Sequence, residues 1–209
     1  MNLPNKLSLT RIILVPFILL FMLPIHIGSW APAAWNDFIS EYGMIVAAVL
    51  FVIASITDLV DGKIARKYNL ITNLGKFLDS LADKMLVISV LIALVDLNRL
   101  SAVWVCIIVL REFAVTGIRM LASAQGVVMA AKMIGKIKTV TQMIAIIYLM
   151  FESLLIKIFH AILTSAEVSD ITYYVQIVGN ILFIGCVIMT IISGMDYVMN
   201  NLKYFKENI

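Results

Sequence analysis

Six long apolar stretches, separated by short polar segments, dominate the hydrophobic pattern of this chain. Each stretch is long enough to cross about 30 Å of hydrocarbon as a helix. Neither a soluble linker nor an internal repeat interrupts the pattern, so we expect one domain over residues 1–209. The fold class predicted is an all-α integral membrane protein with six transmembrane helices, at about Thr10–Ile27, Tyr42–Asp61, Leu74–Val95, Leu100–Leu121, Lys138–Phe159 and Ile171–Asn200.

The composition agrees with this pattern. Hydrophobic residues make up 62% of the chain and charged residues only 14%, which excludes a soluble globular protein and a disordered segment. The N-terminus resembles a signal peptide, because Lys6 and Arg11 precede an apolar run that ends near Ala31-Pro32-Ala33. We expect this segment to be retained, since the later helices make cleavage unnecessary for insertion.

Basic residues are divided unequally between the two predicted membrane faces. Only Arg99 and Lys157 fall on one face, so the positive-inside rule places the other face in the cytoplasm. The net charge of +3 reflects this asymmetry and does not indicate nucleic-acid binding. The residues on the cytoplasmic face are Lys6, Arg11, Lys63, Arg66, Lys67, Lys76, Lys84, Arg111, Arg119, Lys132, Lys136, Lys138, Lys203 and Lys206.

Four carboxylates lie at the cytoplasmic ends of the second and third apolar stretches: Asp58, Asp61, Asp79 and Asp83. Each costs roughly 2.5 to 3.5 kcal/mol at bilayer depth, so the group requires water, cations or basic partners. The spacing of three and four residues places each pair on one helix face, and a short turn can bring both pairs around one cavity. Divalent cations with oxygen ligands relieve the repulsion most directly, which predicts a metal site with magnesium as the default ion.

Small residues and an arginine accompany these carboxylates. Gly62 and Ala65 let a large polar ligand approach the backbone closely, and Gly75 lies one turn before Asp79 on the same face. The Arg66 guanidinium suits a phosphate, so the segment favours a metal-bound diphosphate. The alternative is a salt-bridged helix pair in which the aspartates are neutralised by Lys63, Arg66, Lys67, Lys76 and Lys84.

A second polar cluster begins in the fourth apolar stretch. Arg111-Glu112 and Arg119 interrupt it, and Lys136 and Lys138 begin the fifth. At about 100° per residue the two arginines lie within roughly 80° of each other, so both can face the cavity of the aspartates. On this interpretation, we expect the cluster to bind a second anionic group, distinct from the diphosphate at the metal site. The alternative is a set of topology-setting loop residues together with an Arg111–Glu112 structural pair.

The segment from Asp58 to Asp83 resembles the CDP-alcohol phosphotransferase family. The family signature D-x2-D-G-x2-A-R-x8-G-x3-D-x3-D is matched at every specified position. The resemblance extends over the rest of the chain through the six-span plan and through Pro4-Asn5, Arg11, Arg111-Glu112, Gly117-Ile118-Arg119 and Gly135-Lys136-Ile137-Lys138-Thr139. Two positions depart from the usual pattern, where Ser8 replaces threonine but keeps the hydroxyl and Ser80 replaces proline.

The resemblance implies a reaction and a division of roles. The later segments resemble the bacterial members that make phosphatidylglycerol phosphate, which implies CDP-diacylglycerol as donor, sn-glycerol 3-phosphate as acceptor, a homodimer, and a site on the cytoplasmic side of the cell membrane. Asp58, Asp61, Asp79 and Asp83 would hold two divalent cations, Mg2+ or Mn2+, with Asp83 also acting as the base. The CDP portion would contact Gly62, Ala65, Arg66 and Gly75; the acceptor phosphate Arg111, Arg119, Lys136 and Lys138; and Asn5, Ser8 and Arg11 would support the site.

Other functions are weighed against this one. Related enzymes use inositol phosphate, phosphatidylglycerol or serine as acceptor, and the second basic cluster favours a phosphorylated acceptor over serine. A membrane prenyltransferase also binds metal and diphosphate with aspartate-rich helices, but its two motifs usually lie far apart in a longer chain. A cation-coupled transporter is disfavoured because the chain has neither an inverted repeat nor paired broken helices.

Overall fold

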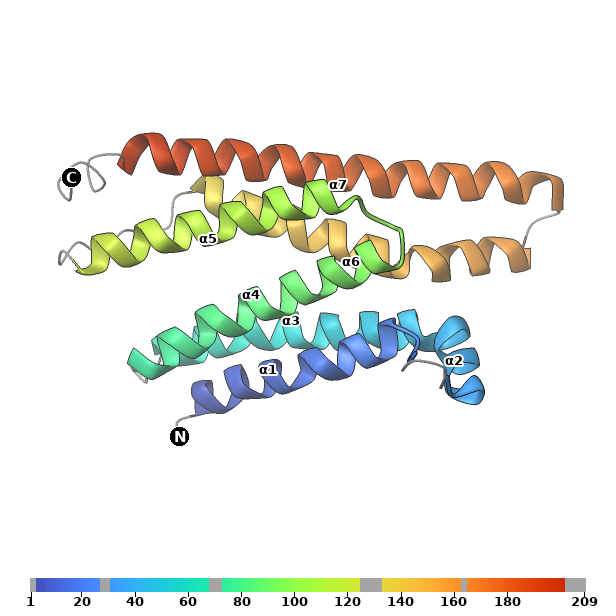
Figure 1. Ribbon diagram of the computed structural model, residues 1–209, viewed down its shortest axis with the longest axis horizontal. Helices are drawn as coiled ribbons and strands as arrows, with labels where there is room; N and C mark the ends of the chain where they lie inside the picture. Colours follow the sequence, from blue (N-terminus) through green and yellow to red (C-terminus); the bar gives the residue numbers. More distant parts are fainter. Residues whose placement is uncertain (1–2, 27–30, 68–72, 125–132, 163–164, 202–209) are drawn as a thin grey trace. The chain divides into compact units, whose positions relative to one another are not determined.

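The computed structural model describes residues 3–26, 31–67, 73–124, 133–162 and 165–201, excluding the side chains of residues 3–4, 59–67, 73–74, 76, 124, 165–169 and 201. These residues form helices and no strand. The elements are α1 (Leu3–Met22), α2 (Ala33–Phe38), the π-helical turn η1 (Ile39–Gly43), α3 (Met44–Lys67), α4 (Asn73–Asp96), α5 (Ala102–Ala124), α6 (Met133–Ile162) and α7 (Ser165–Asn201) (Figure 1).

The chain divides into two compact units, which we describe separately. Unit 1 comprises Met1–Arg99 and Leu149–Ile158, and unit 2 comprises Leu100–Tyr148 and Phe159–Ile209. The division cuts through α6, whose two parts belong to different units. The expectation of a single domain stays a prediction.

The six long helices correspond to the six predicted apolar stretches. The agreement is closest for α4, where Leu74–Val95 was predicted and Asn73–Asp96 is helical. The first helix begins seven residues before the predicted Thr10 and ends at Met22, because Pro24 disfavours helical geometry in the residue before it. The second continues without a break from α2 through η1 into α3, so the signature residues up to Lys67 lie on helical backbone.

In unit 1, α1 packs against both α3 and α4 (Figure 1). One face of α1 carries Val15, Ile18 and Met22 at spacings of three and four, and all three are buried. Alanines on the buried face of α3 (Ala47, Ala48 and Ala54) allow close approach of the helix backbones, as in membrane helix pairs. The same α1 face continues towards the N-terminus with buried Asn5, Ser8 and Arg11, so it changes from apolar to polar along its length.

Gly43 fixes how closely η1 approaches α1. A Cβ atom at this position would lie 2.3 Å from the carbonyl oxygen of Phe21, a distance that only backbone movement can relieve. Glycine at the end of η1 therefore permits this close contact between η1 and α1.

A buried ion pair fixes the end of α4 in unit 1. Asn98 adopts a left-handed conformation, with φ of 56°, and the Arg99 amide donates to the carbonyl of Leu94 at 2.9 Å. This Schellman-type cap directs Arg99 to Glu152 of α6, whose side chain is buried. The connection after α4 is thus tied to the unit 1 part of α6.

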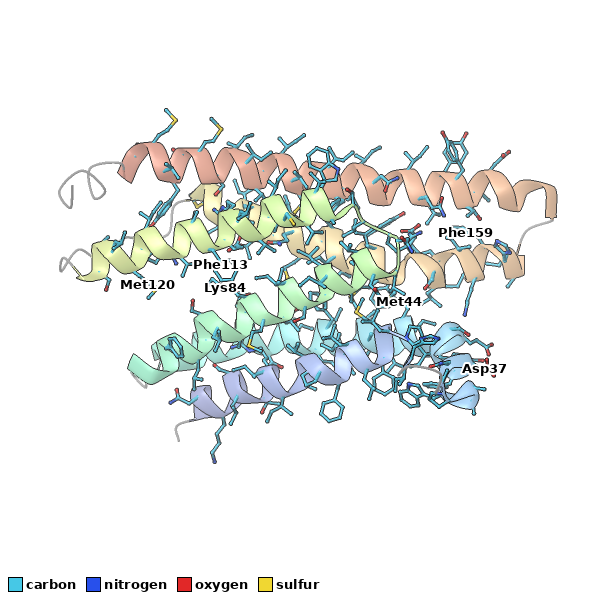
Figure 2. All side chains as sticks on the ribbon, viewed as in Figure 1. Asp37, Met44, Lys84, Phe113, Met120 and Phe159 are labelled. Carbon is cyan, nitrogen blue, oxygen red and sulfur yellow. The ribbon has the colours of Figure 1, made fainter. Side chains whose placement is uncertain are left out.

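Unit 2 pairs α5 with α7. Val115 and Ile118 of α5 pack with Tyr197 of α7, and Val198 covers this cluster. Tyr148 of α6 donates from its hydroxyl to the Val175 carbonyl of α7 at 3.0 Å. Large apolar side chains such as Phe113 and Met120 of α5 remain exposed, as expected for lipid-facing residues (Figure 2).

Four helical segments in the described residues are long and apolar enough to cross a membrane: Asn5–Met22, Ala33–Asp58, Met133–Ile162 and Asp170–Asn200. The prediction of an all-α, multi-pass membrane protein is confirmed at this level. Helices α4 and α5 are not among the four, because charges interrupt both, and the count of six stays a prediction. The interrupting residues are Asp79, Asp83 and Lys84 in α4, and Arg111, Glu112 and Arg119 in α5.

Replacing Arg99 by alanine should destabilise the protein by about 3–5 kcal/mol, because the buried Glu152 carboxylate loses its cation. The double variant Arg99→Met, Glu152→Met removes both charges and should cost much less. Denaturant unfolding in detergent micelles measures both. If the single variant were no less stable than the double variant, the ion pair would not be what fixes the end of α4.

Candidate functional site

Arg11 of α1 contacts two of the signature carboxylates. Its guanidinium donates to Asp58 Oδ1 of α3 through Nη1, and to Asp79 Oδ1 of α4 through Nη2 at 2.7 Å. The same Nη2 lies 3.4 Å from the Ser8 hydroxyl, one turn earlier on α1. Residues far apart in sequence are thereby joined by one side chain, at the polar end of the α1 face.

The three charged side chains differ in how far they are exposed. Arg11 is only 1% exposed, whereas Asp58 is 35% and Asp79 is 52% exposed. The guanidinium therefore lies on the interior side of the pair, and the carboxylates keep an accessible outer side. Two carboxylates share one cation, so Arg11, Asp58 and Asp79 together carry a net negative charge.

The donor set fits the predicted metal chemistry in kind. Carboxylate oxygens on two neighbouring helices are the ligands that Mg2+ and Mn2+ prefer. Asp83 lies one turn after Asp79 on α4, is partly buried and also has a polar contact. Among the residues whose side chains are described, no three His, Cys, Asp or Glu form a metal-binding group, but Asp61 lies outside that set. The four-aspartate metal site stays a prediction.

The predicted CDP-binding residues are only partly described. Gly62, Ala65 and Arg66 lie on the helical backbone of α3, and their side chains are outside the described residues. Gly75 lies in the first turn of α4 and is partly buried. Their role as nucleotide contacts stays a prediction. The predicted supporting residues Asn5 and Ser8 are buried on the same face as Arg11.

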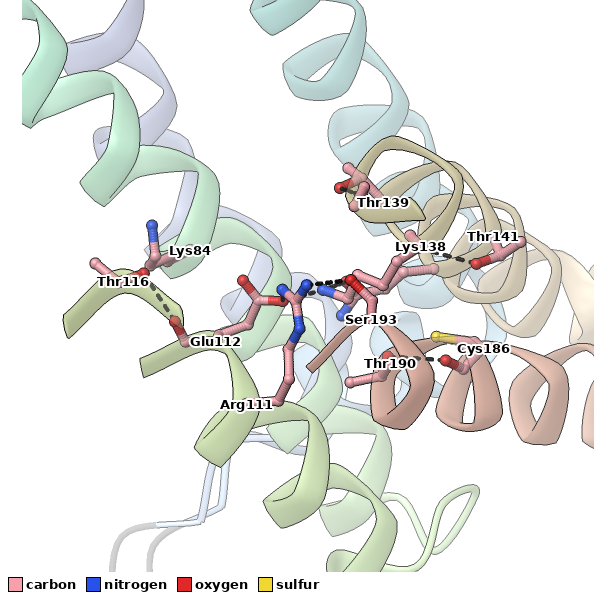
Figure 3. Close-up of polar contacts among 12 residues, drawn as sticks. Lys84, Arg111, Glu112, Thr116, Lys138, Thr139, Thr141, Cys186, Thr190 and Ser193 are labelled. Carbon is pink, nitrogen blue, oxygen red and sulfur yellow. Dashed lines mark hydrogen bonds and ion pairs between the residues drawn. The ribbon is translucent and has the colours of Figure 1, made fainter. Parts of the chain in front are cut away.

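A charged network in unit 2 contains two of the predicted acceptor-binding residues. Arg111 donates to Glu112 Oε1 at 3.1 Å and to the Ser193 hydroxyl of α7 at 2.5 Å. Lys138 of α6 also donates to Glu112 Oε1 (Figure 3). It donates in addition to Gln142 Oε1 at 2.6 Å. The Arg111–Glu112 pair that the sequence left open as a structural alternative is therefore present, and it extends to Lys138.

This network carries more donors than acceptors. Two cations share the one carboxylate of Glu112, which leaves a net positive charge among these residues. Within the part of the chain that the structure describes, Arg111 Nε and Gln142 Nε2 are buried without a hydrogen-bond partner. A buried donor without a partner costs about 1–3 kcal/mol, so an oxygen-rich anion would offset a cost that the free protein bears.

The other two predicted acceptor-binding residues lie differently. Arg119 of α5 and Lys136 of α6 are exposed, so they are available to a ligand or to lipid headgroups. The aspartates belong to unit 1 and these basic residues to unit 2, so the prediction that both sets face one cavity stays a prediction.

Two neighbouring residues of α7, Ser193 and Gly194, were missed in the sequence. Ser193 accepts the hydrogen bond from Arg111, and a Cβ atom on Gly194 would lie 2.9 Å from Arg111 Cγ. The missing side chain lets Arg111 lie directly against α7. The Ser-Gly interruption of an apolar helix is the signal that could have identified these residues in the sequence.

A pocket of about 380 Å3 lies at the opposite end of unit 1 from Arg11, and it contains none of the predicted site residues. It is lined by residues that include Asn36, Glu41, Arg99 and Lys157. Arg99 and Lys157, the two basic residues predicted on the outer membrane face, therefore line one pocket.

Comparisons with known proteins agree with the signature. The chain matches the CDP-alcohol phosphatidyltransferase family over residues 1–192. It is 41% identical over 207 residues to the "CDP-diacylglycerol--glycerol-3-phosphate 3-phosphatidyltransferase" of Bacillus subtilis, covering 99% of this chain and 98% of that protein. Proteins with the same name from Rickettsia felis and Shigella flexneri are 35% and 30% identical, covering 98% and 94% of this chain and 97% and 92% of theirs.

Replacing Gly194 by alanine should destabilise the protein by about 1–3 kcal/mol, because the new methyl group displaces Arg111. The matched control is Gly185→Ala on the same helix, where nothing lies within 4 Å of the new Cβ. This control should stabilise the helix by up to about 1 kcal/mol through helix propensity. Denaturant unfolding in detergent compares the two, and equal shifts in the same direction would contradict the assigned role of Gly194.

Proposed function

Because the chain belongs to the CDP-alcohol phosphatidyltransferase family, we propose that it transfers the phosphatidyl group of CDP-diacylglycerol to sn-glycerol 3-phosphate. The products are phosphatidylglycerol phosphate and CMP, so the protein acts as a phosphatidylglycerophosphate synthase. Relatives that share 35% to 41% of its residues over nearly the full length carry this activity in their names.

The observation that carries the proposal is the convergence of Asp58 and Asp79 on one guanidinium. Both belong to the signature from Asp58 to Asp83, and α3 and α4 bring them to the same end of unit 1. Their accessible sides support a role for the signature in binding cations. The alternative is a salt-bridged helix pair neutralised by Lys63, Arg66, Lys67, Lys76 and Lys84. It does not account for a buried arginine supplied by a third helix.

The site residues divide the work of the reaction. Asp58, Asp61, Asp79 and Asp83 would hold two divalent cations, Mg2+ or Mn2+, which when bound neutralise the diphosphate and polarise its phosphorus. Asp83 accepts the proton of the glycerol hydroxyl as its oxygen attacks that phosphorus, and the bond to CMP breaks. Gly62, Ala65, Arg66 and Gly75 receive the CDP portion.

The positive network of unit 2 suits the acceptor. An acceptor that carries its own phosphate needs fixed positive charge to orient its hydroxyl. Lys138 supplies buried charge and Arg111 supplies partly buried charge, and among the described residues Arg111 Nε and Gln142 Nε2 are donors that no partner uses. Arg119 and Lys136 supply exposed charge. The surplus of donors favours glycerol 3-phosphate or another phosphorylated acceptor over serine.

The proposed membrane arrangement has all six long helices crossing the bacterial cytoplasmic membrane. Helices α4 and α5 cross because most of their charges have protein partners, for example Arg111 with Glu112. The positive-inside distribution places the aspartates and both termini in the cytoplasm, where a soluble phosphate meets the lipid donor. A homodimer, implied by the family resemblance, completes this proposal.

The activity is tested with purified protein by measuring CMP release from CDP-diacylglycerol. Glycerol 3-phosphate, inositol phosphate, phosphatidylglycerol and serine are offered as separate acceptors, each with and without Mg2+ or Mn2+. We expect metal-dependent release with glycerol 3-phosphate. Release with another acceptor alone would change the substrate within the family, and no release with any acceptor would overturn the proposal.

Replacing Asp83 by asparagine should abolish CMP release, because the amide accepts no proton from the acceptor hydroxyl. Binding of CDP-diacylglycerol should remain measurable, since the other aspartates are intact. Asp170→Asn at the exposed start of α7 is the control and should leave the rate unchanged. A near-normal rate for Asp83→Asn would remove this residue as the base.

Replacing Arg119 by alanine should raise the KM for glycerol 3-phosphate more than the KM for CDP-diacylglycerol. Removing one charged hydrogen-bond partner corresponds to about 1.5–3 kcal/mol, or roughly 10- to 150-fold. Lys6→Ala removes a different exposed cation from the same predicted face and should change neither value strongly. Equal losses for the two substrates would reject the assigned role of Arg119.

A further inference from the structure

Arg11 is the most deeply buried of the three charged side chains Arg11, Asp58 and Asp79 in unit 1. It is 1% exposed, and a buried arginine on a membrane helix is stable only with partners. The partners of Arg11 include two of the signature carboxylates, Asp58 and Asp79, and the Ser8 hydroxyl. Each of the two carboxylates has an exposed outer side. The family resemblance implies only that Arg11 supports the site. The contacts show which groups its guanidinium holds.

We propose that Arg11 is the positioning residue of the divalent-cation site, which holds one oxygen each of Asp58 and Asp79 from the protein interior. The other side of each carboxylate then faces outwards, where a cation can be bound. The proposal rests on the proposed function only in assuming that these aspartates bind a divalent cation. Side-chain partners behind metal ligands commonly fix the orientation of those ligands.

The shape of the side chain explains why arginine occupies this position. The two terminal nitrogens of the planar guanidinium point in fixed, different directions, and each reaches a carboxylate on a different helix. A lysine ammonium has no such fork and would favour one of the two carboxylates. Arg11 thus sets the separation of Asp58 and Asp79 as well as their charge balance.

Arg11 also opposes the mutual repulsion of the carboxylates in the metal-free protein. Without a cation between them, Asp58 and Asp79 would repel each other and turn towards water. The shared guanidinium keeps both in place before the metal arrives, so less reorganisation accompanies metal binding. A different arrangement, in which Arg11 competes with the metal for the same oxygens, predicts tighter metal binding once Arg11 is removed.

The exposed fractions decide between these two arrangements. A competing cation would lie on the outer side of the carboxylates, where the metal enters. Arg11 is instead 1% exposed, while Asp58 and Asp79 are 35% and 52% exposed. The exposed sides of Asp58 and Asp79 would therefore be the ones that hold a metal, away from the guanidinium, and removal of Arg11 should weaken metal binding.

The test measures Mn2+ affinity of the purified full-length protein by electron paramagnetic resonance, without nucleotide or lipid substrate. Arg11→Gln should weaken Mn2+ binding by about 10- to 100-fold. Arg11→Lys keeps the charge but loses the fork, and it should weaken binding by several-fold. The matched control is Lys84→Gln on α4, which removes one positive charge from a lysine bonded to Ser80; its Mn2+ affinity should be equal to or higher than that of the wild type.

Each outcome is decisive. Unchanged or tighter Mn2+ binding by Arg11→Gln overturns the positioning role while leaving the metal site intact. If Arg11→Gln does not fold, as judged by circular dichroism, Arg11→Lys decides, and wild-type affinity in that variant overturns the role. Absence of Mn2+ binding by the wild type overturns both this inference and the metal site. Failure of CMP release by a protein that binds Mn2+ overturns only the proposed function.

Discussion

The shared salt bridge of Arg11 with Asp58 and Asp79 is the interaction on which the organisation of unit 1 depends. Charges at membrane depth are tolerated only when they are paired, and three helices each contribute one member of this group. The α1 face that packs against α3 and α4 through Val15 and Ile18 also delivers Arg11 to the aspartates. Apolar packing and charge pairing therefore require the same orientation of α1 about its helix axis.

Charged side chains are also paired in unit 2, but there the excess charge is positive instead of negative. In unit 1 one cation serves two carboxylates, whereas in unit 2 Arg111 and Lys138 share Glu112. The first group retains negative charge and the second retains positive charge and unused donors. The proposed function needs excess negative charge to bind cations and excess positive charge to bind a phosphorylated acceptor. Each excess requires that the charged side chains are not fully neutralised by one another, which is unfavourable for stability.

Local features of the fold were predictable from the sequence, and long-range pairs were not. Hydrophobic length identified α4 to within one residue at each end, because composition along one helix determines it. The partners of Arg11 lie 47 and 68 residues away, so helix packing determines them and spacing along the chain does not. Ser193 and Gly194 were missed for the same reason, since their importance depends on Arg111 lying against α7. The signature itself was readable because its residues lie close together in the sequence, on α3 and α4.

The pairing of the charges on α5 supports the proposal that this helix crosses the membrane, although the charges exclude it from the apolar spans. Arg111 and Glu112 face each other and their partners in unit 2, while Leu110 and Phe113 beside them are exposed. Arg119, near the end of the helix, has a side chain long enough to reach the interface. A span of this kind depends on tertiary contacts, because an isolated α5 would expose its charges to lipid. In the proposed six-span arrangement, a count from hydropathy alone misses helices whose polar residues bind one another, and those residues are the ones available for chemistry.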